Sequence, residues 1–187
     1  MKPSYATLKK NHYSSNDMNP SYVGAIDAYQ EVGYDINELI KQNPGYVNTC
    51  ALRMSLALLK SGVQFTGRLR IKPGEFTGRS FEPGAKLLAD QLKKESIFGM
   101  PKLLNRENAL KYLVDKKGVI LFWKIDGYNG GHIDIIESTT TLPVLQHRQR
   151  AFYATGALLQ DMGVYLSSFN ISVAKLFLYR ANIHSRL

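Results

Sequence analysis

The chain has 187 residues, 44% of them hydrophobic and 21% charged, and this composition predicts a single folded domain over residues 1–187. Its single cysteine excludes an internal disulfide bond, and no apolar run approaches the roughly 20 residues that a transmembrane helix needs. The net charge of +9 indicates an anionic partner. The basic residues are dispersed, however, so a solvated basic surface is favoured over a nucleic-acid groove.

Residues 1–20 are polar and rich in Ser, Asn and Pro, and they predict a loosely ordered lead-in. Lys2 is not followed by an apolar stretch, so the segment does not have the pattern of a secretory signal. We therefore expect the protein to be made in the cytoplasm without a signal peptide. If it acts outside the cell, other machinery has to carry it there.

Apolar spacing predicts a first helix over residues 21–31 and a short second one over 34–40. The clearest helix follows, with Asn48 as its N-cap, an apolar stripe that reaches Leu58, and Gly62 as its end. This helix is apolar almost all round. The sequence therefore predicts a buried central helix.

After a loop through residue 84, amphipathic helices are expected over 85–95 and 105–117. Aromatic and β-branched residues then predict strands over 119–125 and 132–137, joined by a turn at 126–131. The remaining predicted elements are a third strand, a helix and a closing strand, over 139–146, 148–162 and 171–179. Helices followed by an antiparallel sheet indicate an α+β domain.

Cys50 falls in the first turn of the predicted central helix. A cysteine in an apolar helix is most often an inert buried residue. At a helix start, however, the positive end of the helix dipole favours a thiolate. The unpaired N–H groups there can bind an oxyanion, with the amide of Asn48 as a further donor, although Asn48 can equally serve only as a cap. The position predicts that Cys50 is a nucleophile.

His132 is the candidate general base among four histidines. It follows two glycines, which permit close approach of the backbone, and it opens a predicted strand. His12 lies in the polar lead-in and His184 in the tail, so both are poor candidates, and His147 is a weaker alternative. The competing interpretation of His132 is a strand histidine bonded to the backbone.

A third residue should orient the imidazole and stabilise its charged form. Strand alternation places Asp134 on the same face as His132, which makes it the better carboxylate. Glu137 would need a bulge to turn inward, and Gln146 on the next predicted strand is a further option. The cysteine and the separated histidines give no zinc-ligand spacing, and no phosphate-binding glycine motif occurs, so no metal or cofactor is expected.

Residues 48–55 resemble the nucleophile helix of the type VI secretion amidase effectors, especially their fourth family. Residues 118–134 resemble the strand pair that carries the catalytic histidine of that family. The resemblance covers mainly residues 45–62 and 118–137. It implies a papain-like cysteine hydrolase similar to the NlpC/P60 enzymes, with the nucleophile on a central helix packed against an antiparallel sheet.

The resemblance further implies a peptidoglycan amidase that one bacterium injects into the periplasm of a rival through the type VI secretion apparatus. Such enzymes cut the stem peptide between D-glutamate and meso-diaminopimelate, and a cognate immunity protein blocks the active site in the producer. Cys50 and His132 match the family motif. The family's acid usually follows the histidine strand, but residues 139–150 contain no carboxylate here, which leaves the third residue open.

Two other functions are compatible with the sequence. A phage or housekeeping cell-wall hydrolase would use the same chemistry in another setting. A basic nucleic-acid-binding module without catalysis would explain the positive charge, but the dispersed charge and the lack of a recognition motif argue against it. The positive charge is also consistent with the cell-wall amidase, because a basic enzyme would be retained near an anionic cell wall and would attract an acidic inhibitor.

Overall fold

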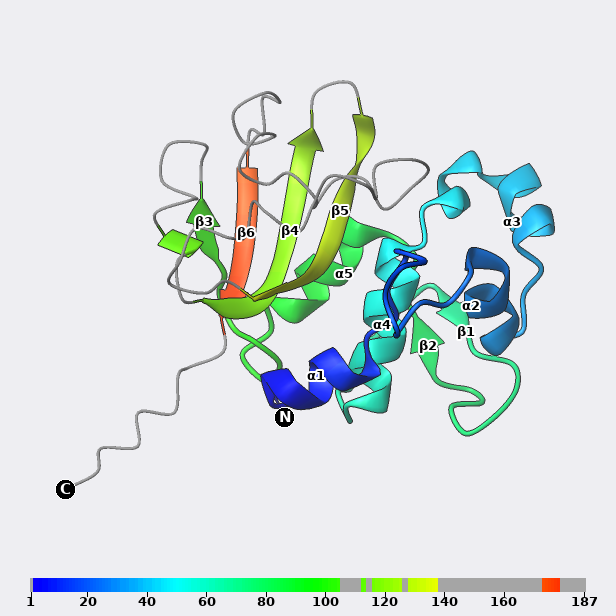
Figure 1. The fold of residues 1–187 in the computed structure, drawn as a ribbon, viewed down its shortest axis with the longest axis horizontal. Helices are drawn as coiled ribbons and strands as arrows, with labels where there is room; N and C mark the ends of the chain where they lie inside the picture. The colour runs from blue at the N-terminus through cyan, green and yellow to red at the C-terminus, as the bar shows by residue number, and fades with distance from the viewer. Residues whose placement is uncertain (1, 105–111, 114–115, 126–127, 138–172, 179–187) are drawn as a thin grey trace.

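The computed structural model describes residues 2–104, 112–113, 116–125, 128–137 and 173–178, and Figure 1 shows their arrangement. The predicted α+β organisation is confirmed, with most helices preceding the main sheet. In chain order the elements are α1 (Tyr5–Asn11), α2 (Ala25–Glu31), α3 (Ile36–Gln42), the 3-10 helix η1 (Pro44–Val47), α4 (Cys50–Lys60), β1 (Leu69–Arg70), β2 (Ser80–Phe81), α5 (Ala85–Leu92), β3 (Lys102–Leu104), β4 (Lys117–Ile125), β5 (Tyr128–Glu137) and β6 (Val173–Leu178).

The main sheet of the described part has the strand order β3-β6-β4-β5, and all of its pairs are antiparallel (Figure 1). The predicted strands at 119–125, 132–137 and 171–179 are confirmed as β4, β5 and β6. The predicted turn at 126–131 is too long, because β5 already begins at Tyr128. In this order β5 lies at the edge of the sheet, next to the helices.

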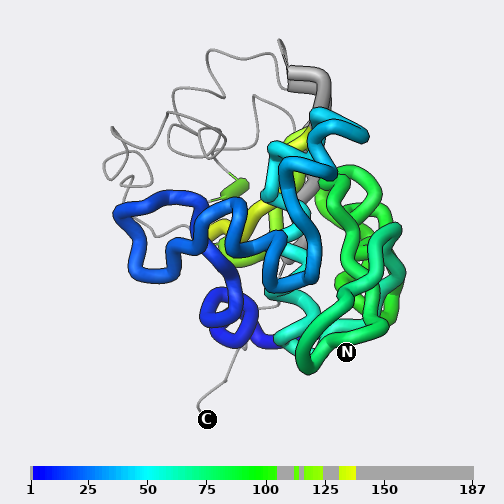
Figure 2. Tube along the Cα trace, turned by 90° about the vertical axis from the view of Figure 1, so that its right-hand side faces the viewer, coloured from blue at the N-terminus to red at the C-terminus, as the bar shows by residue number. Residues whose placement is uncertain are grey.

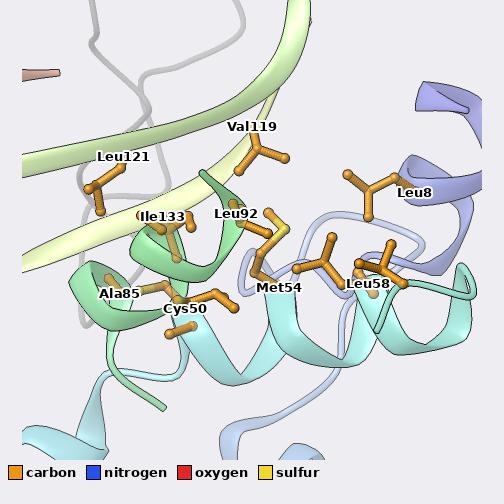
Figure 3. Packing of buried hydrophobic residues seen from close by; sticks show 14 of the residues in the cluster. Leu8, Cys50, Met54, Leu58, Ala85, Leu92, Val119, Leu121 and Ile133 are labelled. Atoms are coloured by element: carbon orange, nitrogen blue, oxygen red, sulfur yellow. The ribbon is translucent and has the colours of Figure 1, made fainter. Parts of the chain in front are cut away.

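Helix α4 is central, as predicted, and buries residues of both its faces. One face packs Met54 and Leu58 against β4, β5 and α5, where Figure 3 shows Val119 and Ile133 above the helix. The opposite face packs with α2, α3 and β2 through Leu52, Leu56, Leu59, Tyr29, Ile36 and Phe81. A helix buried on both sides holds its first residue, Cys50, in a fixed place.

The end of α4 is set by Gly62, as predicted. Gly62 has a φ of 79°, a left-handed conformation that glycine adopts without steric cost. Its N–H donates to Leu59 O, and the N–H of Val63 donates to Leu58 O, both at 2.9 Å. These two bonds form a Schellman motif, and Leu58 and Val63 both lie in the core.

The expected loosely ordered lead-in is wrong for the segment that forms α1. Ser4 Oγ caps the helix by accepting from Thr7 N at 3.0 Å, and Leu8 is completely buried in the core. Figure 1 and Figure 2 both show this segment lying against the body of the molecule. A helix of seven residues has little stability alone, so its packing rather than its own composition stabilises it.

The helices predicted over 21–31, 34–40 and 85–95 correspond to α2, α3 and α5, with shifted ends. Segment 64–84, expected to be a loop, contains the short antiparallel pair of β1 and β2. The strand predicted over 139–146, with Gln146, the helix over 148–162 and most of the helix over 105–117 lie outside the described residues. In the part that the structure describes, no helix has the length and apolar character needed to cross a membrane.

Candidate active site

Cys50 is the first residue of α4. The predicted N-cap at Asn48 would have started the helix one residue earlier, at Thr49. Thr49 occupies the N-cap position but forms no side-chain cap bond. Asn48 supplies the acceptor instead, because its Oδ1 accepts from Cys50 N at 3.3 Å. The prediction that Asn48 is the N-cap residue is thus wrong by one position, because Thr49 occupies the N-cap. Asn48 still accepts a hydrogen bond from the first turn of the helix. The Cys50 N–H is one of the helix-start groups expected to bind an oxyanion, and in this structure it donates to Asn48 Oδ1.

A cavity of about 220 Å³ opens beside Cys50. Its wall includes Asn48, Cys50, Gly84, Lys86, Trp123 and Gly131, contributed by segments far apart in the sequence. Cys50 is only 8% exposed and belongs to the hydrophobic core, yet it borders this cavity. The thiol is therefore shielded from bulk water on most sides and faces a space where a substrate can enter.

Gly131 brings the backbone of β5 close to its surroundings, as predicted for the glycines before His132. A Cβ atom at this position would lie 2.7 Å from Trp123 Cε3 and 3.0 Å from Phe122 O. The Cys50 thiol donates to Gly131 O over a sulfur–oxygen distance of 4.0 Å. The absence of a side chain at Gly131 lets Trp123, β5 and the cysteine meet at one point of the cavity wall.

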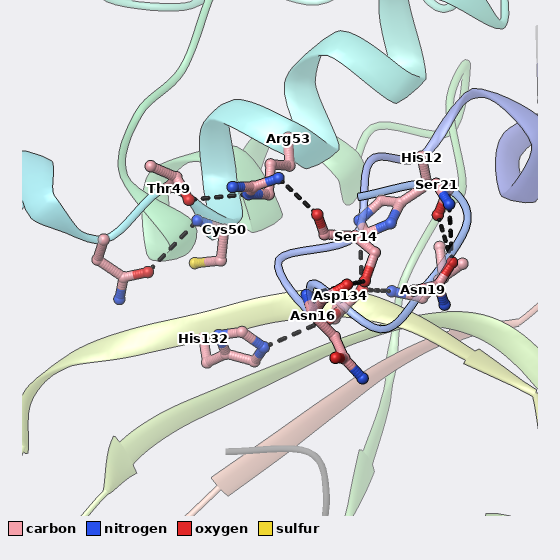
Figure 4. Close-up of polar contacts among 12 residues, drawn as sticks. His12, Ser14, Asn16, Asn19, Ser21, Thr49, Cys50, Arg53, His132 and Asp134 are labelled. Carbon is pink, nitrogen blue, oxygen red and sulfur yellow. Dashed lines mark hydrogen bonds and ion pairs between the residues drawn. The ribbon is translucent and has the colours of Figure 1, made fainter. Parts of the chain in front are cut away.

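His132 pairs with Phe122 across the sheet and is only 4% exposed. Burial alone would lower the pKa of His132, but its interactions with Cys50 and Asp134 raise it to about 10. Nε2 of the ring lies 3.5 Å from Asp134 Oδ2, and Figure 4 shows Cys50 on the other side of the ring from this carboxylate. The structure thus brings the predicted base beside the predicted nucleophile.

Asp134 lies on the same face of β5 as His132, as strand alternation predicted, and its side chain is 24% exposed. Ile135 N donates to its Oδ1 at 2.7 Å. Burial would raise the pKa of Asp134, but the neighbouring His12 and His132 and this N–H lower it. The carboxylate stays ionised next to the imidazole, where it can stabilise the positive charge.

Glu137, the alternative acid, is placed elsewhere. Its carboxylate forms ion pairs with Lys9 at 2.5 Å and Lys117 at 2.6 Å, at the far end of β5. These two lysines lower the pKa of Glu137. Glu137 is therefore not brought to His132, and Gln146 lies outside the described residues.

His12, set aside in the sequence analysis, lies at this site. It is almost completely buried, and its Nε2 lies 3.2 Å from Asp134 Oδ1 (Figure 4). The signal that could have found it is its position four residues after Leu8 in a segment capped by Ser4. A helix that continued through residue 12 would put both side chains on one face. In the structure His12 is the C-cap residue just after α1, and its side chain is buried as that of Leu8 is.

Arg53 is a second buried polar residue that the sequence analysis missed, and it links the first turn of α4 to the N-terminal segment. Its Nε donates to Thr49 Oγ1 and its Nη1 to Ser14 O, both at 2.8 Å (Figure 4). Burial lowers the pKa of Arg53. These bonds fix the segment after His12 against the helix that carries Cys50.

The wall of the cavity around Gly84 is held by Glu82, which the sequence analysis also missed. Its Oε1 accepts from Arg68 Nη2 at 2.6 Å and from Gly84 N at 2.7 Å. Its backbone N–H and C=O both bond Ser55 Oγ on α4 at 3.1 Å. The loop that borders the cavity is thus attached to the helix of Cys50.

We expect Glu82→Ala to lower the free energy of unfolding by about 1–3 kcal/mol, because it leaves the Gly84 N–H unpaired and removes a buried charged partner of Arg68. The half-exposed Arg68 can be rehydrated, which limits the loss. Urea unfolding measures the difference. Glu38→Ala is the matched control, since its exposed pair with Lys41 should contribute at most about 0.5 kcal/mol. Equal losses in both variants would contradict the role of Glu82.

Together, a thiol at a helix start, a buried imidazole and a carboxylate are arranged in series, and the thiol borders a cavity. Such a series can activate sulfur as a nucleophile, with the imidazole as base and the carboxylate as its partner. Among the described residues, no group of three or more His, Cys, Asp or Glu side chains is arranged to hold a metal ion.

Residues 46–172 match the family model described as type VI secretion system (T6SS), amidase effector protein 4, Tae4. The chain belongs to the Tae4 family. The matched segment contains Cys50, His132 and Asp134, and the family identity confirms the resemblance seen in the sequence. A search of curated proteins found no match to the chain.

Solved structures of Tae4 proteins have a similar fold. The Tae4–Tai4 effector–immunity complex from Salmonella Typhimurium matches with 19% identity and a TM-score of 0.54, over 94% of this chain and 97% of that one. The Salmonella typhimurium Tae4 in complex with the immunity protein Tai4 from Enterobacter cloacae matches with 17% identity and a TM-score of 0.55, over 94% of this chain and 98% of that one. At these identities the likeness shows that the α+β fold is shared.

Proposed function

We propose that this Tae4-family effector is a papain-like cysteine amidase that cuts the stem peptide of peptidoglycan between D-glutamate and meso-diaminopimelate. The observation that carries the proposal is the series of Cys50, His132 and Asp134, with Cys50 at the wall of a cavity. Membership of a family of type VI amidase effectors supports this setting over a phage or housekeeping hydrolase.

In the proposed mechanism, His132 takes the proton of the Cys50 thiol and the thiolate attacks the carbonyl carbon of the scissile amide. The raised pKa of His132, about 10, favours its charged form beside the thiolate. The imidazolium then gives its proton to the leaving amine, and a thioester remains on Cys50. Water, deprotonated by His132, hydrolyses the thioester and regenerates the thiol. The amide of Asn48 is the proposed donor to the oxyanion.

Charge at the cavity supports an acidic peptide as substrate. Lys86 borders the cavity, as does the start of α5, where Gly84 offers no side-chain cap. The positive end of a helix and a lysine favour carboxylate groups, which the stem peptide carries at both D-glutamate and diaminopimelate. Lys86 also forms an ion pair with Asp90 on the same helix.

We propose further that the effector acts in the periplasm of a target bacterium, is delivered by the type VI apparatus, and is blocked by an immunity protein. Solved relatives are Tae4 proteins bound to Tai4 immunity proteins, which supports a partner of that kind. The net charge of +9 favours an acidic inhibitor. An inhibitor that covers the cavity beside Cys50 would stop the reaction.

The test is digestion of purified peptidoglycan that contains meso-diaminopimelate, with identification of the products by mass spectrometry. We expect fragments that end in D-glutamate and partners with a newly freed amine on diaminopimelate. Peptidoglycan with the D-glutamate–diaminopimelate bonds already cut is the control and should release nothing more. Cleavage at another bond would contradict the proposed specificity, and no cleavage at all would contradict the proposed activity.

A further inference from the structure

His12 is a buried polar side chain that the mechanism above does not use. It follows α1 directly, as the C-cap residue of that helix, and its side chain is 9% exposed. Its Nε2 lies 3.2 Å from Oδ1 of Asp134, more than a hundred residues away in the sequence. Burying a histidine without a partner is costly, so the contact with the Asp134 carboxylate offsets part of the cost of burying His12.

We propose that His12 is a positioning residue that holds the Asp134 carboxylate in place against the His132 ring. The inference rests on the proposed function, because it concerns the orientation of the acid in that mechanism. It extends the series of Cys50, His132 and Asp134 by a fourth side chain, which comes from the N-terminal helix.

The two oxygens of Asp134 have separate partners. Oδ1 lies 3.2 Å from His12 Nε2 and accepts from Ile135 N at 2.7 Å. Oδ2 faces His132 Nε2 at 3.5 Å. Two donors on Oδ1 stop the carboxylate from rotating about its terminal bond, and Oδ2 is left directed at the imidazole. Without His12, Oδ1 would keep the backbone N–H of Ile135 as a donor, but it would lose the contact from the side of α1.

His12 is held by contacts to the elements that carry the nucleophile and the base. Leu8 is buried in the core with Cys50, and Asn11 Nδ2 donates to Ser61 Oγ at the end of α4 at 3.1 Å. Lys9 pairs with Glu137 at the far end of β5. Helix α1 therefore lies across α4 and β5 and fixes the distance between His12 and Asp134.

The charges around His12 set its protonation state. The titratable groups that face it are Asp134 and His132 on β5 and Arg53 on α4. Burial is the largest influence and lowers the pKa of His12, Asp134 raises it, and the two positive groups lower it. His12 is therefore neutral at neutral pH, and the geometry requires its proton on Nε2 so that the ring donates to Asp134.

Kinetics of two His12 variants test the proposal. His12→Phe fills the site but cannot donate, and we expect kcat to fall about tenfold to a hundredfold, as for loss of one hydrogen bond to a charged group, with KM within about twofold. The high-pH limit of activity should move to lower pH, because a misdirected Asp134 stabilises the His132 imidazolium less well. His12→Gln, whose amide can donate from a similar place, should recover most of the rate.

A double-mutant cycle separates positioning from a general structural role. In an Asp134→Asn background, His12→Phe should cost less than about twofold more, since no carboxylate remains to be held. An equal loss in both backgrounds would overturn the proposal, as would a Gln variant as slow as the Phe variant. Thermal unfolding of each variant shows whether it is folded.

One measurement needs neither a variant nor a substrate. Imidazole nitrogen chemical shifts of the unmodified protein should show His12 as the neutral tautomer with its proton on Nε2 at neutral pH. The other tautomer, or a charged His12, would overturn the proposal even if all variants failed to fold. If the expected tautomer is found but peptidoglycan is not digested, the proposed function fails while the contact between His12 and Asp134 stands.

Discussion

Replacing Cys50 by alanine is expected to abolish release of peptidoglycan fragments, with a fall in kcat of at least about a thousandfold, since the variant has no nucleophile to form the thioester. The fold should survive, because Cys50 lies at the helix start and alanine is a good helix former. Chromatography of the digest measures the rate, and circular dichroism checks the fold. A variant that still releases fragments at a rate near that of the parent would remove Cys50 from the mechanism.

The unique cysteine makes a chemical version of this experiment specific. The chain has one thiol, so an alkylating reagent of the iodoacetamide type can modify only Cys50 among its cysteines. Because Cys50 borders the cavity, we expect modification and loss of activity to proceed at the same rate. Cys50→Ser is the control: it should take up no reagent and stay inactive, since a serine hydroxyl is a far weaker nucleophile. Full activity after complete alkylation would contradict the proposed role.

The sequence predicted well those elements that can be recognised from residues close together in the chain. The apolar residues of α4 and the left-handed Gly62 define a helix and its end without reference to the rest of the chain. The run from Val119 to Ile125 is rich in β-branched and aromatic residues, a composition that favours a strand. Alternation along β5 then put His132 and Asp134 on one face, as observed.

The parts that were missed depend on contacts between distant segments. Helix α1 has seven residues and β1 has two, so neither carries a strong periodic signal. Polar composition made the N-terminal segment look unstructured, whereas Leu8 and His12 pack against α4 and β5. Glu82 gave no local sign that it would bond to Arg68 and Gly84.

The sequence limited the candidates for the third residue of the site to a few positions but did not decide among them. Asp134 and Glu137 are both carboxylates on β5. The side chains that surround each carboxylate distinguish their roles. His12 and His132 approach Asp134, whereas Lys9 and Lys117 approach Glu137. The resemblance to the effector family pointed to an acid after this strand, but residues 139–150 contain no carboxylate. Our proposal therefore places the acid on the same strand as the base.

Asp134→Asn is expected to lower kcat by about a hundredfold to ten-thousandfold, because the neutral amide can neither stabilise the His132 imidazolium nor enforce its orientation. Its effect on pH dependence follows from the pKa of His132, about 10, which the carboxylate helps to raise. Removing that charge lowers the pKa of His132, so the imidazolium is lost at lower pH. The high-pH limit of kcat/KM should therefore move down. Glu137→Gln is the matched control on the same strand and should leave both the rate and this limit unchanged, since its partners are lysines remote from Cys50. If the Gln variant shifted the limit and the Asn variant did not, Glu137 rather than Asp134 would be the acid of this site.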